Sequence, residues 1–363
     1  MDAVLTNLVD RVRAAAAAGT PLAIRGGGSK DFYGEPVGGE PLETGALSGI
    51  VSYEPSELVV TVRAGTPLAQ LEQLLAASGQ SLPFEPPHFG PGATVGGMVA
   101  TGLSGPARAS VGSVRDYVLG LQLVNGRAEQ LVFGGQVMKN VAGYDVSRLM
   151  VGALGTLGLV TEVSLKVLPL APAEATLKFA LSQDEALRKL NAWGGQPLPL
   201  NASCWLQDEG GAGTLYLRLR GAVAAVAAAC RSLGGERQDP AQSASDWDAC
   251  REQRLPWFEA CGARDLWRLS VPQTAPVLDL PEAPLVEWHG AQRWVRAAPG
   301  QGEPLRALAA RAGGHATLFR AADPASTGRQ PPLAPALATI QRELKRQFDP
   351  AGIFNPGRLF PEA

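Results

Sequence analysis

Three stretches of the chain concentrate glycine in a way that could bind a negatively charged group. The stretch GATVGGMVATGLSGP, residues 92–106, holds five glycines and no charged side chain. The other two are GGGS, residues 26–29, and GALGTLG, residues 152–158. Successive backbone N–H groups in a turn can bind an anion, and glycine permits both the turn and the close approach. One such stretch alone favours a tight loop between strands, but three in one region favour a main-chain site for a diphosphate.

Four serine and threonine residues among these glycines would donate hydrogen bonds from their hydroxyl groups, in place of the lysine of other nucleotide sites. They are Ser29, Thr94, Thr101 and Ser104. The dinucleotide fingerprint G-x-G-x-x-G is absent from the sequence, and no Gly-Lys pair exists to form the phosphate loop G-x-x-x-x-G-K-[ST]. A Rossmann site and a P-loop site are therefore not predicted.

Histidine is the natural candidate for acid–base chemistry, and the chain has three. His88 directly precedes the second glycine stretch, and His315 follows the pair Gly313-Gly314, so these two are the candidate catalytic residues. A lone histidine is more often structural or solvated, and His289, between Trp288 and a glycine, is read in the same way. The three lie too far apart in the sequence for a metal triad, and no metal site is predicted.

The four cysteines, Cys204, Cys230, Cys250 and Cys261, contain no C-x-x-C pair, so neither a zinc site nor an iron–sulfur ligand set is predicted. We expect free and mostly buried thiols, as in a reducing cytosol.

All seven tryptophans lie after residue 190. Core and interface packing is the preferred interpretation of these rings, with an electron-transfer stripe as the alternative.

Length and composition indicate a soluble protein of more than one domain. The chain has 363 residues, 45% of them apolar and 18% charged, with a net charge of −2 and no basic patch for nucleic acid. The N-terminal stretch predicts an amphipathic helix that ends at Gly19 and is interrupted by charges, unlike a signal peptide. No run of about 18 apolar residues is present. A cytoplasmic location is expected, with at most peripheral attachment to a membrane.

Glycine content changes near residue 170, since 26 of the 43 glycines precede it. The proline-rich stretch 168–175 lies at this change, which predicts domains at 1–169 and 170–312 and a C-terminal segment, 313–363, that packs back on the first domain. The first domain reads as short strands with few helices: a strand before the glycine triplet, two strands within 49–67, a helix over 68–79, and a hairpin at Asn125-Gly126. The second predicts an antiparallel sheet with helices on one face. The class is therefore α+β, not a doubly wound parallel sheet.

Five motifs in order carry a resemblance to a known family. They are PLAIRGGGSK, PPHFGPGATVGGMVATGLSGP, GSVRDYVLG, KNVAGYDVSRLMVGALGTLGLVTEVSLKVLP and DPAGIFNPGRLF. Together they resemble the FAD-binding flavoproteins of the vanillyl-alcohol oxidase and p-cresol methylhydroxylase (PCMH) type, and within that family the FAD-binding subunits of bacterial glycolate oxidase. The likeness continues through LPWF, LWRLSVP, GAQRWVRA and AGGHATLFR, so it covers most of the chain.

The resemblance implies a two-subdomain PCMH-type FAD domain, an α+β cap and a returning C-terminal segment. It also implies which residues contact FAD. One half of the diphosphate cradle would be Arg25, Gly26, Gly27, Gly28, Ser29 and Lys30. The other half would be Thr94, Gly96, Gly97 and Met98, with Thr101, Gly102 and Ser104 continuing along the cofactor. The ribose or ring side would be lined by Ser113, Arg115 and Asp116, then by Gly155, Gly158, Val160 and Thr161, with Asn355 and Arg358 of the NPGR ending returning to the flavin.

The departures from the family pattern are informative. Members with covalent flavin often carry a histidine in the turn of the glycine triplet, and its absence here predicts non-covalent FAD. The histidine cluster that hydroxyacid-oxidising relatives carry in the cap is also missing. The resemblance implies a glycolate oxidase that converts glycolate to glyoxylate together with a second flavoprotein and an iron–sulfur subunit, and passes electrons to an acceptor other than O2. This chain would relay electrons or complete the assembly. The alternatives are a stand-alone FAD-dependent 2-hydroxyacid dehydrogenase and a non-catalytic scaffold subunit.

Overall fold

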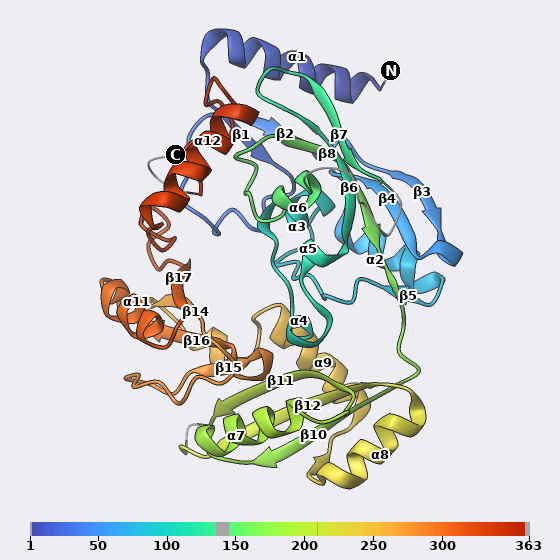
Figure 1. Ribbon diagram of the computed structural model, residues 1–363, viewed down its shortest axis with the longest axis vertical. Coiled ribbons are helices and arrows are strands. Elements are labelled where there is room, and N and C mark those ends of the chain that lie inside the picture. The colour runs from blue at the N-terminus through green and yellow to red at the C-terminus, as the bar shows by residue number, and fades with distance from the viewer. Residues whose placement is uncertain (1, 136–144, 209, 360–363) are drawn as a thin grey trace. The chain divides into compact units, whose positions relative to one another are not determined.

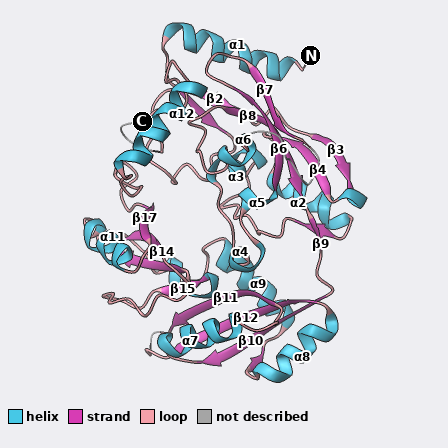
Figure 2. Cartoon of the chain, viewed as in Figure 1, coloured by secondary structure: helices cyan, strands magenta, loops and turns pink. Residues whose placement is uncertain are grey.

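The computed structural model describes residues 2–135, 145–208 and 210–359 (Figure 1). The chain forms two compact units. Unit 1 comprises Met1–Leu103, Ser113–Pro169 and Ala325–Ala363, and unit 2 comprises Ser104–Gly112 and Leu170–Pro324. Residues 313–324, which the sequence analysis grouped with the C-terminal segment, belong to unit 2 because they contain a strand of its sheet. Both units mix helices with antiparallel sheets, which confirms the predicted α+β class (Figure 2).

The first part of unit 1 is built on a short parallel pair of strands. Helix α1, Ala3–Ala18, is capped by Asp2 and ends at Gly19 in the left-handed conformation, as the sequence predicts. Strand β1, Leu22–Arg25, pairs in parallel with β2, Glu40–Glu43. On its other side β1 meets the C-terminal segment through a bridge between Leu22 and Phe354. The apolar face of α1 closes this small core.

The second part of unit 1 is a five-stranded antiparallel sheet in the order β3-β4-β8-β6-β7. The strands are β3 Ile50–Glu54, β4 Val59–Arg63, β6 Val118–Val124, β7 Gln130–Gly134 and β8 Leu159–Lys166. Helices α2, Leu68–Ala77, and α3, Val95–Thr101, pack on one face and share its core. The predicted hairpin is confirmed as β6–β7, although a longer turn replaces the two-residue loop, with the Asn125 side chain accepting from two backbone N–H groups.

The remaining elements of unit 1 are short, apart from its last helix. They are η1 Pro55–Glu57, β5 Gln80–Ser81, α5 Val114–Tyr117, α6 Val146–Leu149, β9 Leu168–Pro169 and α12 Pro335–Phe348. Lys345 of α12 links the C-terminal segment to the rest of unit 1. Its Nζ donates to the carbonyl oxygens of Thr156 (2.7 Å) and Phe354 (2.8 Å) and to Asp349. Burial lowers the pKa of Lys345, while Asp349 acts in the opposite direction.

Unit 2 is built on an eight-stranded antiparallel sheet in the order β13-β10-β12-β11-β15-β16-β14-β17. Its strands are β10 Ala173–Ala180, β11 Leu200–Gln207, β12 Gly213–Gly221, β13 Glu236–Arg237, β14 Asp265–Ser270, β15 Leu285–Glu287, β16 Gln292–Ala297 and β17 His315–Arg320. Its helices are α4 Arg108–Val111, α7 Gln183–Gly194, α8 Val223–Leu233, α9 Pro240–Arg251, α10 Pro256–Glu259, η2 Trp288–Gly290 and α11 Gly302–Arg311.

Helices cover both faces of this sheet, whereas the sequence analysis expected them on one face only. Alternate strand residues point to opposite faces, and one face packs against α7 and α8 through a core that includes Trp205 and Leu217. The other face meets α9 and α10, where the rings of Phe258, Trp294 and Phe319 stack edge to face. All seven tryptophans are buried, as the packing interpretation predicts. Among the described residues, no helix combines the length and apolar character needed to span a bilayer.

Candidate functional site

A cavity in unit 1 brings the three glycine-rich stretches together. It measures about 550 Å³ when the part open to solvent is counted. Its walls come from the ends of β1 and β4, from α3, from the turn between α6 and β8, and from the C-terminal segment. The described lining residues are Ile24, Gly26, Thr44, Ala64, Gly96, Gly97, Ala100, Met150, Ala153, Leu154, Gly155, Leu157, Gly158, Leu159, Val160 and Asn355. None of them carries a charge.

The first two glycine stretches approach each other backbone to backbone. A Cβ on Gly27 would lie 1.5 Å from the carbonyl oxygen of Gly92, and a Cβ on Gly26 would lie 2.4 Å from Thr94 Oγ1. Side chains at these positions would force the loops apart. Glycine is therefore required at 26 and 27 by the contact between the two loops, in addition to any contact with a ligand.

The turn after β1 holds unused main-chain donors. Gly28 adopts φ 73°, and the turn is closed by a hydrogen bond from the Asp31 N–H to the Gly28 carbonyl oxygen, 3.1 Å. Among the described residues, no acceptor is found for the N–H groups of Gly27, Gly28 and Ser29. Consecutive free N–H groups in such a turn are the arrangement that binds phosphate oxygens. They directly follow Gly26, which lies on the cavity wall.

The second stretch forms a wall that any side chain would narrow. Thr94 caps α3, and its Oγ1 accepts from the Gly97 N–H at 3.2 Å. A Cβ on Gly96 would press against Ala64, 2.9 Å from its Cβ. A Cβ on Gly97 would meet, outside the backbone of α3 and among the described residues, only Thr94 Oγ1, at 3.2 Å. Packing against neighbouring segments therefore does not explain why glycine lies at position 97 on the cavity wall. A ligand that passes close to the backbone would explain it.

Asn355 joins the third glycine stretch to β1. Its Oδ1 accepts from the Ile24 N–H at 2.7 Å, and its Nδ2 donates to the Leu154 carbonyl oxygen at 2.7 Å. The residue is 4% exposed and lies on the cavity wall. A Cβ on Gly155, which adopts φ 72°, would come within 2.7 Å of Asn355 Nδ2. One amide side chain therefore fixes the positions of two cavity walls.

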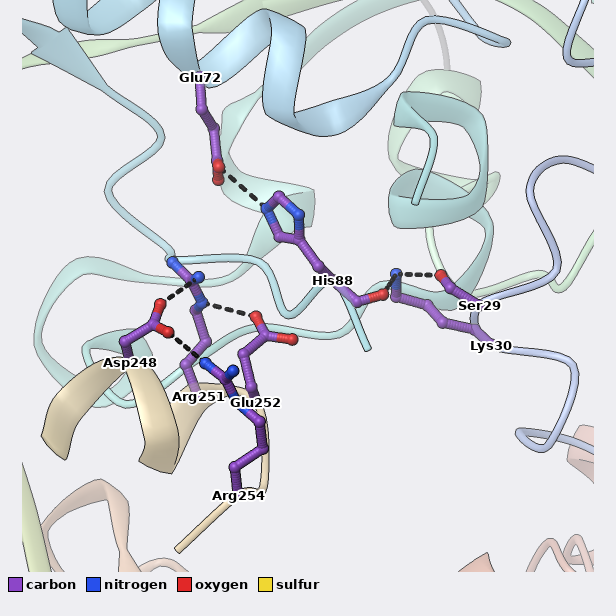
Figure 3. A network of polar contacts seen from close by, with 8 residues as sticks. All are labelled: Ser29, Lys30, Glu72, His88, Asp248, Arg251, Glu252 and Arg254. Carbon is purple, nitrogen blue, oxygen red and sulfur yellow. Dashed lines mark hydrogen bonds and ion pairs between the residues drawn. The ribbon is translucent and has the colours of Figure 1, made fainter. Parts of the chain in front are cut away.

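The charged residues predicted at the site lie off the cavity. Lys30 Nζ donates to the carbonyl oxygen of His88 at 3.1 Å and approaches Ser29 Oγ at 3.4 Å (Figure 3). Arg25 pairs with Asp31, Nε to Oδ2 2.8 Å. Arg358 donates to the carbonyl oxygens of Glu35 and Asp31, both at 3.1 Å, and burial lowers its pKa. These side chains support the loops around the cavity rather than line it.

Several other predicted residues also lie outside the lining. Met98 is buried in the core beside α3, and Thr101 Oγ1 donates to the Gly97 carbonyl oxygen inside the helix, 2.9 Å. Gly102 ends α3 in the left-handed conformation, and Thr161 is buried in β8. Ser104 belongs to unit 2.

The predicted G-S-x-R-D segment forms a local structure of its own. Ser113 and Asp116 cap α5, with Asp116 Oδ2 accepting from the Ser113 N–H at 2.7 Å. Arg115 Nη2 donates to the Val151 carbonyl oxygen at 3.3 Å, which links α5 to the third glycine stretch. Part of the motif that precedes this stretch, residues 139–144, lies outside the described residues.

Neither candidate catalytic histidine lines the cavity. His88 Nε2 lies 2.9 Å from Glu72 Oε2 in unit 1, and His315 is exposed at the start of β17 in unit 2. His289 is the more unusual residue. Its Nε2 pairs with Ser110 Oγ at 2.9 Å, its buried Nδ1 has no partner among the described residues, and burial lowers its pKa to about 4.

Several lining residues were not predicted from the sequence. They are Ile24, Thr44, Ala64, Ala100, Met150, Ala153 and Leu154. Thr44 reaches the site because β2 runs beside β1, its N–H donating to the Arg25 carbonyl oxygen at 2.9 Å. Ile24 had a signal, because it comes just before the glycine triplet. Small and apolar residues such as Ala64 and Ala100 carry no chemical signal of their own.

Comparison with known proteins agrees with this geometry. Residues 5–134 match the family described as FAD binding domain. The chain is 46% identical to glycolate oxidase subunit GlcE of Escherichia coli strain K12, over 98% of this chain and 97% of that protein. The chain belongs to the GlcE family of FAD-binding proteins. The match spans both units.

More distant relatives match only part of the chain. Glycolate oxidase subunit GlcD of Bacillus subtilis is 33% identical over 43% of this chain and 34% of that protein. The mitochondrial D-lactate dehydrogenase [cytochrome] of Arabidopsis thaliana is 31% identical over 44% of this chain and 29% of that protein. A solved structure of alkyldihydroxyacetonephosphate synthase has a TM-score of 0.67 at 16% identity, covering 97% of this chain and 74% of that one. It supports the fold, and the family membership makes this chain an FAD-binding flavoprotein.

Proposed function

We propose that this chain is the FAD-binding subunit of a glycolate oxidase that converts glycolate to glyoxylate. The observation that carries the proposal is that three glycine-rich stretches and Asn355 meet in one uncharged cavity, in a chain that matches GlcE from end to end. An uncharged wall suits a ligand whose diphosphate is held by main-chain N–H groups. A site for a small free anion would instead recruit arginine or lysine.

The residues proposed to hold FAD are those of the cavity and its neighbouring turn. Gly27, Gly28 and Ser29 offer free N–H groups to the diphosphate, and Gly97 leaves room for it. Asn355 keeps the opposite wall in place. Binding is non-covalent in this proposal, because the described lining contains no histidine, cysteine or tyrosine that could form a bond to the flavin. Bound FAD would supply the redox chemistry of this chain, which is to take up electrons and pass them on.

The complex proposed around this chain contains a second flavoprotein subunit and an iron–sulfur subunit, located in the cytoplasm or at the inner face of the membrane. Electrons would leave to an acceptor other than O2. Neither His88 nor His315 lines the cavity, so no general base is assigned to this subunit. We therefore place substrate oxidation on the partner flavoprotein and give this chain the role of relaying electrons or completing the assembly.

The absorbance spectrum of the purified chain, before and after glycolate, tests the proposal. A flavin spectrum that glycolate leaves unbleached supports the relay role, and release of FAD by acid confirms non-covalent binding. Bleaching by glycolate or D-lactate, with turnover of an artificial acceptor by the chain alone, would instead establish a stand-alone hydroxyacid dehydrogenase. A colourless chain that takes up no added FAD would favour a scaffold subunit and contradict the proposal.

A further inference from the structure

Unit 2 contains a second cavity, between α9 and the sheet face that α9 covers. It measures about 780 Å³ when the part open to solvent is counted. The sheet contributes Thr176, Cys204 and Tyr216, and α9 contributes Ser243, Trp247 and Cys250. Its described lining residues all belong to unit 2, and none of them lines the cavity of unit 1.

The hollow follows from the sequence of α9. The helix turns three residues toward the sheet, Ser243, Trp247 and Cys250, at a spacing that places them on one face. Only one of the three is large. A tryptophan between a serine and a cysteine cannot fill the space on both of its sides, so the helix rests on the sheet and leaves a gap.

The walls of this gap are fixed before any ligand binds. Trp247 Nε1 donates to Thr176 Oγ1 at 2.9 Å, and the Arg218 guanidinium lies 4.8 Å from the centre of its ring. Trp257 is held in the same way by Arg296, at 4.5 Å. At the end of α9, Asp248 pairs with Arg251 and Arg254 (Figure 3). Two indole rings locked by cations form a preformed aromatic wall.

A buried hydroxyl group of the described lining has no hydrogen-bond partner. Ser243 is 5% exposed, and its Oγ has no hydrogen-bond partner among the described residues. The neighbouring thiol is already used, since Cys250 Sγ donates to Glu287 Oε1 at 3.3 Å. A buried hydroxyl without a partner costs stability, and a ligand with a hydroxyl or carbonyl group would relieve that cost.

The charge near the cavity limits the ligand further. Asp246 is an exposed lining residue, and the described lining contains no lysine or arginine. Within the described lining, an anionic ligand such as glycolate or a phosphate would contact a carboxylate and no cationic side chain, since the guanidinium groups of Arg218 and Arg296 are already engaged with Trp247 and Trp257. We propose that this cavity binds an uncharged aromatic small molecule whose hydroxyl or carbonyl group hydrogen-bonds Ser243. The inference is independent of the function proposed for unit 1.

Calorimetric titration of the FAD-loaded protein with three naphthalene probes tests the proposal. We expect 2-naphthol to bind at one site, naphthalene to bind more weakly because it cannot reach Ser243, and 2-naphthoate not to bind. Replacing Ser243 with alanine should weaken the affinity for 2-naphthol about five-fold, because one neutral hydrogen bond contributes about that much. The affinity for naphthalene should not change. Ser245, exposed on the same helix, gives the matched control Ser245→Ala, which should change neither.

A second variant fills the cavity. Ser243→Leu should abolish binding of both 2-naphthol and naphthalene, whereas Ser245→Leu should not. If Ser243→Leu fails to fold, the comparison of Ser243→Ala with Ser245→Ala still tests the proposal. Absence of saturable 2-naphthol binding, or equal effects at positions 243 and 245, would overturn the proposal. A flavin-free Gly97→Val protein that still binds 2-naphthol would show that the probe does not occupy the FAD site.

Discussion

Gly27 lies against the main chain of Gly92, so close that a Cβ on Gly27 would sit 1.5 Å from the Gly92 carbonyl oxygen. The contact joins the turn after β1 to the loop before α3, the two loops proposed to hold the FAD diphosphate. Both the packing of the two loops and the proposed binding of FAD therefore require glycine at position 27. A substitution of Gly27 affects loop packing and FAD binding together, whereas a substitution of Gly97 affects mainly FAD binding.

Gly27→Ala is expected to destabilise unit 1 by at least ~3 kcal/mol, because no side-chain rotation can remove an overlap with a backbone oxygen. Urea unfolding of the purified variant measures this loss. Gly38→Ala is the matched control, since a Cβ there would meet nothing within 4 Å and the residue is exposed. Equal unfolding midpoints for the two variants would show that the loops are not held together as described.

Gly97→Val is expected to abolish FAD retention while costing only about 1–2 kcal/mol of stability. The new side chain would enter the cavity, where Thr94 Oγ1 is the only atom of the described residues within 4 Å of its Cβ outside the backbone of α3. Flavin absorbance per mole of protein measures retention, and urea unfolding measures the fold. Gly194→Val, at the exposed end of α7 in unit 2, should retain full flavin. Normal flavin content in Gly97→Val would count heavily against the proposed site.

Local sequence signals were sufficient to predict several elements of unit 1. The helix ending at Gly19 and the hairpin near Asn125 depend on residues within one or two turns of each other, so their patterns can be read directly. The glycine stretches predicted close approaches of the main chain, because a residue without a side chain permits such an approach. Gly26, Gly97 and Gly155 all line the cavity.

Contacts between distant segments could not be read in this way. Thr44 reaches the cavity only because β1 and β2 pair in parallel. A threonine in the sequence does not indicate which strand will lie beside it. Arg25 and Lys30 were assigned to the cradle by resemblance, yet their side chains turn to Asp31 and to the His88 carbonyl oxygen. The position of a long charged side chain depends on partners that the local sequence does not identify.

Asn355→Asp is expected to destabilise unit 1 by about 2 kcal/mol and to weaken FAD binding. The carboxylate can still accept from the Ile24 N–H, but it cannot donate to the Leu154 carbonyl oxygen, and a buried charge is placed beside that oxygen. Urea unfolding and a flavin titration measure the two effects. Asn191→Asp gives a control, because that exposed amide also donates to a carbonyl oxygen, of Leu187, at 2.9 Å. If both variants lose the same stability, the linking role of Asn355 is wrong.

His289 is expected to make unit 2 less stable in mild acid. Burial lowers its pKa from 6.5 to about 4, because a protonated ring would carry a buried Nδ1–H with no acceptor among the described residues. The unfolded state therefore binds the proton first. Stability from this group is fully present above pH 6.5 and declines as the pH falls toward 4, with a loss of about 2 kcal/mol at pH 5.

The variant His289→Asn isolates this effect from other titrating groups. Asparagine tolerates the left-handed conformation at this position, φ 55°, and has no proton to gain in this range. Unfolding free energies of both proteins between pH 7.5 and pH 5 should converge or cross as the pH falls, because only the wild type loses the histidine contribution. Parallel curves would mean that His289 titrates normally, and that its ring finds an acceptor or solvent in the folded protein.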